Sequence, residues 1–180
     1  MKDATFLYIL AETLESEGLF VDNKADSGGA TKYGITEGVA RANGYSGDMR
    51  DLPLAMAKEI YYKEYWLKPN FHRIADLNKE VARELFDTGV NVGVVLATKW
   101  LQRSLTVLNK EGKLYDDLVA DGQIGFKTIE ALSAHLHHRR TPDVLIKAMN
   151  VLQGYHYISL AERREKDEHF VYGWLDKRVR

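Results

Sequence analysis

The segment Glu17-Gly-Leu-Phe-Val-Asp-Asn-Lys-Ala-Asp26-Ser-Gly-Gly-Ala-Thr31-Lys-Tyr-Gly-Ile-Thr36 determines how the rest of the chain is interpreted. It follows a predicted amphipathic helix whose buried stripe contains Phe6, Ile9, Leu10, Thr13 and Leu14. Glu17 falls in the middle of this stripe, whereas Glu12 and Glu15 fall on the opposite face. Gly18 ends the helix. The spacing therefore predicts that the carboxyl group of Glu17 points towards apolar neighbours.

Two physical effects favour the protonated form of Glu17. Partial burial disfavours a carboxylate, and the partial negative charge at a helix C-terminus disfavours it as well. A carboxyl group that stays protonated near neutral pH is what a general acid requires. The alternative is that Glu17 bends out to solvent at Gly18, because Glu residues are rarely buried without a partner. Helix position alone leaves both interpretations open.

The loop after the helix supplies a second carboxyl group and a hydroxyl group. Asp26 and Thr31 flank Gly28-Gly29, where the backbone can turn sharply and approach a ligand closely. Most glycosidases need one protonated and one ionised carboxyl group on either side of the bond that is cut. Glu17 and Asp26 fit such an unequal pair, and Thr31 could position a water molecule. Taken alone, Asp26 is equally consistent with a turn-forming residue before two glycines.

This segment resembles the N-acetylmuramidases of glycoside hydrolase family 108, which include phage endolysins and secretion-associated bacterial muramidases. The resemblance rests on Glu17-Gly18 and on the run Asp26-Ser-Gly-Gly-Ala-Thr-Lys-Tyr-Gly-Ile-Thr36. The order Glu, Asp, Thr is also similar to the catalytic triad of T-even phage lysozymes. The chain departs from the family pattern at Leu19, where the family has a second Gly, and at Ser27, where it has Pro. Neither departure removes a reactive group.

The resemblance implies that the chain cleaves the β-1,4 bond between N-acetylmuramic acid and N-acetylglucosamine in peptidoglycan. Glu17 would protonate the leaving oxygen, and Asp26 and Thr31 would hold the attacking water. By analogy with the phage triad we expect inversion of the anomeric configuration, which needs a carboxyl separation of roughly 6.5–9.5 Å; a separation of about 5–5.5 Å would favour a covalent intermediate instead. We further predict that Tyr33, Tyr65, Trp66 and Asn91 contact the substrate. No cofactor is expected.

Two parts of this prediction, the Tyr65-Trp66 pair and Asn91, have a structural alternative. Tyr65 and Trp66 belong to an aromatic cluster that could stack on sugar rings, although such clusters more often fill a core. Asn91 lies in the run Phe86-Asp87-Thr-Gly-Val-Asn91-Val-Gly93, which looks like another element of the family. Asn at a helix end followed by Gly is also ordinary helix termination. The residues alone therefore leave a structural role open for both.

Composition limits the classes of partner. The formal net charge is −1, so no overall basic field attracts the chain to nucleic acid or to anionic membranes. Cysteine is absent, which excludes disulfides and thiolate metal sites. No segment reads as a cleavable signal peptide or as a membrane span. We therefore expect a monomer made in the host cytoplasm that does not insert into membranes and reaches the periplasmic wall after release. For a phage endolysin, the family implies a holin as the partner that gives access.

The C-terminal half contains a second resemblance. The run Asp121-Gly-Gln-Ile-Gly125-Phe-Lys-Thr128-Ile-Glu-Ala-Leu132 is similar to a signature of helical peptidoglycan-binding domains, in which a Gly-rich turn leads into a helix. The signature is specific to the fold more than to binding. His135 and His138 could face one side of that helix, but no carboxylate accompanies them at ligand spacing, so we predict no metal site.

The sequence as a whole predicts a mostly helical, lysozyme-like fold with a small hairpin between Gly18 and Thr36. We expect a muramidase region at 1–92 and a peptidoglycan-binding-like helical region at 93–180, packed closely together. Two other functions are weighed against hydrolysis: a non-catalytic wall-binding or secretion accessory protein, and a helical nucleic-acid binder. The neutral charge argues against the second of these.

Overall fold

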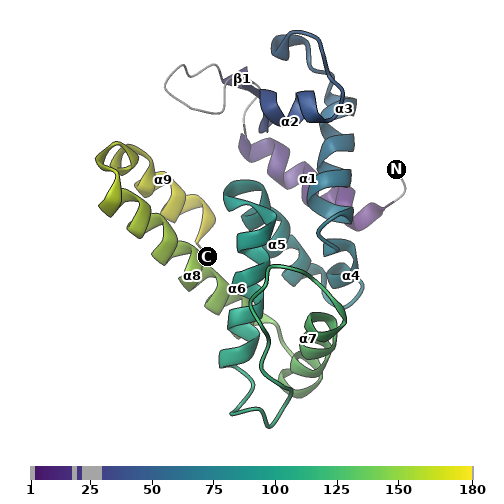
Figure 1. The fold of residues 1–180 in the computed structure, drawn as a ribbon, viewed down its shortest axis with the longest axis vertical. Coiled ribbons are helices and arrows are strands. Elements are labelled where there is room, and N and C mark those ends of the chain that lie inside the picture. The colour runs from purple at the N-terminus through teal and green to yellow at the C-terminus, as the bar shows by residue number, and fades with distance from the viewer. Residues whose placement is uncertain (1–2, 18–19, 22–29, 180) are drawn as a thin grey trace. The chain divides into compact units, whose positions relative to one another are not determined.

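The computed structural model describes residues 3–17, 20–21 and 30–179, and side chains for all of these except 15–17 and 20–21. The chain forms two compact units, Met1–His72 and Arg73–Arg180. Most of the described residues are helical, and the strands are two residues long each (Figure 1). The expected mostly helical fold with a small hairpin is thus confirmed. None of the helices in the described ranges is long and apolar enough to cross a bilayer.

The first unit opens with α1 (Ala4–Glu17), whose inward stripe is the predicted one. Phe6, Ile9 and Leu10 are all at most 2% exposed. Asp3 begins the helix, because its Oδ1 accepts a hydrogen bond of 2.9 Å from the backbone N–H of Phe6. Its Oδ2 accepts a second hydrogen bond, of 2.7 Å, from Nε1 of the buried Trp66. One carboxylate therefore both caps α1 and fixes the central aromatic residue of this core.

A three-stranded antiparallel sheet follows α1, with the order β1 (Phe20–Val21), β2 (Thr31–Lys32) and β3 (Ile35–Thr36). Lys32 lies opposite both Phe20 and Ile35 in the register. The connection between β2 and β3 is the pair Tyr33-Gly34, with φ values of 53° and 74°. Positive φ at both central residues is the pattern of a type I′ turn, which suits the twist of a tight hairpin.

Short helices complete the first unit. Thr36 caps α2 (Glu37–Ala42) as its sequence position predicts, and a 3₁₀ turn spans Met49–Asp51. The next helix begins later than the sequence suggests: α3 (Leu54–Ile60) starts after Pro53, and Asp51 does not cap it. The reason is that a residue preceding proline is forced out of the helical region, and Leu52 accordingly has ψ 118°. A π-helix (Tyr61–Leu67) and α4 (Phe71–Ala75) follow.

The second unit is built on α5 (Lys79–Val92), α6 (Val94–Val107), α7 (Phe126–Arg139) and α8 (Asp143–Arg163). Asn78 caps α5, because its Oδ1 accepts a hydrogen bond of 3.0 Å from the N–H of Val81. Gly93, with φ 96°, is the single residue between α5 and α6, and it lets the chain reverse so that the two helices pack together. The 3₁₀ turn Glu165–Asp167 and α9 (Glu168–Arg178) return along α8 (Figure 1).

The tail folds back through aromatic and polar contacts within this unit. The rings of Tyr157 and Trp174 lie 5.3 Å apart, joining α8 to α9. Arg178 forms an ion pair of 2.9 Å with Asp87 of α5. Because α5 packs on α6 and α8, it belongs to the same compact unit as the C-terminal helices. The predicted boundary between a muramidase region and a peptidoglycan-binding-like region, at residues 92 and 93, stays a prediction.

Candidate active site

The hairpin after α1 brings together the segments that carry the predicted catalytic residues. Glu17 is the last residue of α1, and Phe20 begins β1 only three residues later, within about 11 Å along the chain. Phe20 pairs with Lys32, the neighbour of Thr31 on β2. Asp26 belongs to the connection between β1 and β2. The side chain of Glu17 and the whole of Asp26 lie outside the described residues, so their predicted roles stay predictions.

Thr31 is the predicted catalytic residue whose surroundings are described. It lies on the central strand, opposite Val21 of β1 and Thr36 of β3, and it is partly exposed. The next strand, β3, is anchored in the core by Ile35, which is fully buried. The backbone N–H of Glu37 also donates a hydrogen bond of 2.9 Å to the carbonyl of Ala30. The backbone of Thr31 is therefore held by a strand on each side, and its side chain is partly exposed.

Tyr33 occupies the turn of this hairpin, and two neighbours hold the turn in place. The hydroxyl of Tyr61, a fully buried residue, donates a hydrogen bond of 2.9 Å to the carbonyl of Tyr33. The ammonium of Lys32 lies 5.1 Å from the centre of the Tyr33 ring and donates to the carbonyl of Arg50. A tyrosine at φ 53° costs about 1 kcal/mol. The structure thus holds an aromatic side chain in a strained conformation beside the predicted catalytic segment.

The aromatic cluster in the π-helix divides into two environments. Tyr65 is partly exposed, and its ring lies 5.4 Å from that of Tyr61. Burial, and to a lesser degree the charge of Glu64, raises the pKa of Tyr65, so its hydroxyl stays protonated and can donate a hydrogen bond. Trp66 is 0% exposed, and its ring packs 5.7 Å from Phe6. The structure gives Trp66 the core role that the sequence left open, and we leave it out of the site.

Asn91 also has an internal partner. Its Oδ1 accepts a hydrogen bond of 2.6 Å from the hydroxyl of Tyr157, which in turn accepts one of 2.9 Å from Gln153. Burial is the main cause that raises the pKa of Tyr157 to about 12, so this hydroxyl remains a donor. Asn91 therefore connects α5 to α8 in the second unit, which is the structural alternative for this residue.

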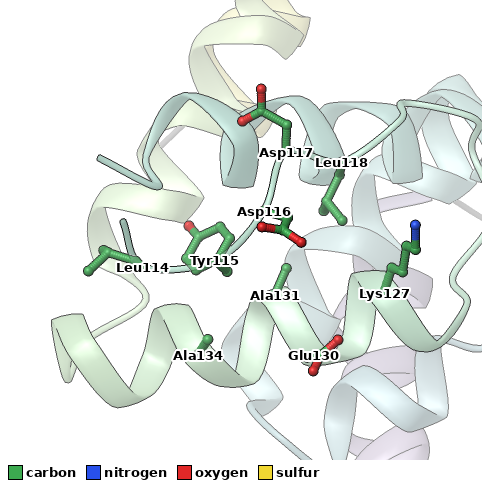
Figure 2. A pocket seen from close by; sticks show the side chains of 9 residues that line it. All are labelled: Leu114, Tyr115, Asp116, Asp117, Leu118, Lys127, Glu130, Ala131 and Ala134. Carbon is green, nitrogen blue, oxygen red and sulfur yellow. The ribbon is translucent and has the colours of Figure 1, made fainter. Parts of the chain in front are cut away.

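The second unit contains a feature that the sequence did not reveal. The Gly-rich turn at 121–125 does lead into α7, as predicted. Beside it lies a cavity of about 290 Å³, between the loop segment 114–118 and the first turns of α7 (Figure 2). The Gly-rich turn is organised by Gln102, which is 2% exposed on α6 and bonds to Gly122 and Gln123. A glutamine between the buried Leu101 and Leu105 was the available signal, because a polar residue in an apolar stripe needs partners.

The histidines at the end of α7 lie in different environments. His135 is 1% exposed, with Nδ1 at 2.9 Å from the hydroxyl of Tyr115, whereas His137 and His138 are exposed. Burial, then the charge of Arg139, lowers the pKa of His135. Within the described ranges, no group of three His, Cys, Asp or Glu residues is arranged to hold a metal ion.

Comparison with known proteins assigns each half of the sequence to a family. Residues 10–93 match the family described as glycosyl hydrolase 108, and residues 96–179 match a predicted peptidoglycan domain. Among solved structures, the chain is similar to Brucella abortus SagA, with a TM-score of 0.61 and 25% sequence identity. That match covers 93% of this chain and 95% of the other. No curated protein matches the chain.

Proposed function

We propose how this member of glycosyl hydrolase family 108, a peptidoglycan hydrolase, cuts its substrate: Glu17 is the acid, and Asp26 and Thr31 activate the water. As in its family, the bond is the β-1,4 linkage between N-acetylmuramic acid and N-acetylglucosamine. Glu17 donates its proton to the glycosidic oxygen as the bond to the anomeric carbon breaks. Asp26 accepts a proton from a water molecule, which attacks that carbon from the opposite face.

One observation carries this proposal. Pairing of β1 with β2 connects the end of α1, where Glu17 lies, to the strand that carries Thr31, with Asp26 in the connection between them. Three residues separated in sequence thus belong to one hairpin and the helix that enters it. Tyr33 and Tyr65 supply aromatic surface in the same unit, and we propose that they contact the glycan. Inversion follows if the two carboxyl groups leave room for a water molecule between them.

The decisive variant is Glu17→Gln, which keeps the size of the side chain and removes its acidic proton. Loss of a general acid lowers rates by about 10²- to 10⁴-fold, so release of muramic acid reducing ends should fall by this factor. Glu12→Gln on the same helix is the matched control and should retain activity. Thr31→Val should lose about two- to tenfold, the equivalent of one hydrogen bond of about 1 kcal/mol. Full activity of a folded Glu17→Gln protein, verified by circular dichroism, would refute the assignment.

We further propose that the protein acts as a phage-type endolysin that depends on a holin for access to the wall. This follows from the likeness of the Glu17–Thr36 segment to phage enzymes. Expression in the cytoplasm of a susceptible bacterium should leave growth unaffected until the inner membrane is permeabilised with chloroform, whereupon turbidity should fall. Lysis of intact cells by the active protein without permeabilisation would exclude holin dependence, with Glu17→Gln as the inactive control.

A further inference from the structure

The cavity beside α7 continues into a second hollow. The first, of about 290 Å³, is lined by charged side chains and by apolar ones that include Leu118 and Ala131. The second, of about 430 Å³, shares Leu118 and Lys127 with the first and includes the side chain of Phe126, which is 73% exposed. We call the two together the α7 groove. Each hollow is at the small end of the range for ligand pockets. The groove therefore suits a peptide side chain or two better than a run of sugar rings.

The loop that forms one wall of the groove is held by side chains of α6. Gln102 donates hydrogen bonds to Asp121 and to the carbonyl of Gln123, at 2.8 and 3.0 Å, and accepts one of 2.9 Å from the N–H of Gly122. Thr106 accepts a hydrogen bond of 3.0 Å from the N–H of Leu118. These hydrogen bonds hold the loop from within the unit, so binding would not have to supply the free energy of ordering it.

Three charged side chains of the groove are not neutralised internally. Asp116 belongs to the loop, and Lys127 and Glu130 belong to the first two turns of α7. All three are exposed, and none has a hydrogen bond or ion pair with any part of the chain that the structure describes. In Figure 2, Asp116 extends towards α7, whereas Asp117 points away from it. Asp117 is used elsewhere, since it accepts a hydrogen bond of 2.7 Å from Asn109.

These charges fit a ligand that carries an ammonium group and a carboxylate close together. Asp116 and Glu130 can accept from the ammonium, and Lys127 can donate to the carboxylate. The methylene groups of such a ligand would lie on Leu118 and Ala131. A neutral sugar would leave the separated charges without partners. A ligand with carboxylates alone would meet four negative side chains of the groove and one positive one, Lys127; the negative ones are Asp116, Asp117, Asp121 and Glu130.

We propose that the α7 groove binds the stem peptide of peptidoglycan at its diamino acid. The form that it binds is a diamino acid whose side chain ends in an ammonium group and a carboxylate on the same carbon. This inference rests on the proposed function, which makes peptidoglycan the substrate. Stem peptides of the diaminopimelate type have such an end, whereas those of the lysine type offer an ammonium group only. The exposed Phe126 lies where the neighbouring D-alanine could contact it. The groove would thus hold the wall while the first unit cuts the glycan.

The test is titration of the full-length wild-type chain with two synthetic tripeptides, with binding measured by NMR or by calorimetry. One is L-Ala-γ-D-Glu-meso-diaminopimelate, and the other has L-Lys in the third position. We expect the first to bind about three- to tenfold more tightly, because only it has a carboxylate on the same carbon as its side-chain ammonium group, where Lys127 can reach it while the ammonium contacts the acidic side chains. Lys127→Met should reduce its affinity to that of the lysine peptide. Asp116→Asn and Glu130→Gln should weaken both peptides.

Lys147→Met and Glu162→Gln, which make matched charge changes on α8, serve as controls and should bind like the wild type. Equal affinity of the wild type for the two tripeptides, no binding of either, or full binding by Lys127→Met would overturn the proposal. So would binding of peptide-free glycan strands in the groove, detected as shifts of the Asp116 and Lys127 resonances. Release of reducing ends from peptide-free glycan by the wild type is measured separately, so failure of the hydrolase assignment would be recognised independently.

Discussion

Replacing Gln102 by methionine tests how the second unit builds its loop. Methionine has a similar length and volume, so the change removes the amide without leaving a large cavity. The amide nitrogen of Gln102 lies 2.8 Å from Oδ1 of Asp121, 3.0 Å from the carbonyl of Gln123 and 3.2 Å from the hydroxyl of Thr128. Its oxygen lies 2.9 Å from the N–H of Gly122. One side chain thus anchors four groups of the loop and of α7.

The expected loss of stability in Gln102→Met is the sum of the hydrogen bonds that the partners of Gln102 lose. The backbone groups of Gln123 and Gly122 lose hydrogen bonds worth about 1 kcal/mol each. The bond to Asp121 is charge-assisted, but this carboxylate is exposed and rehydrates, so we count about 1 kcal/mol for it as well. Thr128 keeps a weak bond to the Gln123 carbonyl and adds little. Gln102→Met should therefore lower the free energy of unfolding by about 3 kcal/mol.

Urea unfolding followed by circular dichroism measures this loss, and at a slope of about 2 kcal/mol/M the midpoint should fall by about 1.5 M. Arg103→Met, an exposed change on the same helix, should stay within about 0.5 kcal/mol of the wild type. NMR gives a second readout. The Gln102 hydrogen bond is the largest cause that lowers the pKa of Asp121, followed by the backbone N–H of Gln123, so in the variant this pKa should rise towards its usual range.

The sign of the pH dependence follows from that shift. Because the pKa of Asp121 is lowered in the folded state, its contribution is present above the unfolded pKa, about 3.9, and is lost as the pH falls through the folded pKa. The stability difference between wild type and Gln102→Met should therefore narrow on acidification below about pH 4. A loss under 1 kcal/mol at neutral pH, or an unchanged pKa of Asp121, would refute the view that Gln102 holds the loop.

Two further predictions concern the core and the pH dependence of stability. Trp66→Phe removes the hydrogen bond to Asp3 and leaves a cavity, so urea unfolding should show a loss of about 2–3 kcal/mol; a loss below 1 kcal/mol would contradict the core role of Trp66. Burial lowers the pKa of His135, so its neutral form is favoured in the folded state, and stability should decline as the pH falls from about 6.5 through the folded pKa. Urea unfolding at pH 7.5 and 5.5 should show this decline, by at most about 1.4 kcal/mol per pH unit, and His135→Phe should reduce it; an unchanged pH dependence in that variant would contradict the assignment.

Local signals in the sequence predict much of the fold. Thr36 caps α2, and a cap of this kind can be predicted because it depends only on residues within one turn. The hairpin between Gly18 and Thr36 was expected from its glycines, and β2 and β3 meet at the Tyr33-Gly34 turn. The start of α3 was missed because the restriction that Pro53 places on Leu52 outweighs the capping tendency of Asp51.

The parts that could not be predicted depend on residues far apart in the sequence. Gln102 organises the loop around Asp121, 19 positions later, and no local rule connects the two. Trp66 is a core residue because Asp3, 63 positions earlier, accepts its N–H, and the sequence alone could not choose between this role and a sugar platform. The roles of Glu17 and Asp26 are predicted by spacing and by family resemblance, and the Glu17→Gln experiment above tests the role of Glu17.

The position of α5 bears on how such enzymes can be recombined. The hydrolase family assignment ends at residue 93, yet α5 buries Val81, Leu85 and Phe86 in the unit that also contains α6 and α8. An exchange of genes at that boundary would separate α5 from the helices that cover its apolar face, and a hydrolase half produced alone would expose this face and tend to aggregate. We therefore expect the hydrolase segment and the C-terminal segment of such proteins to stay together in evolution, and they should be kept together in engineered variants.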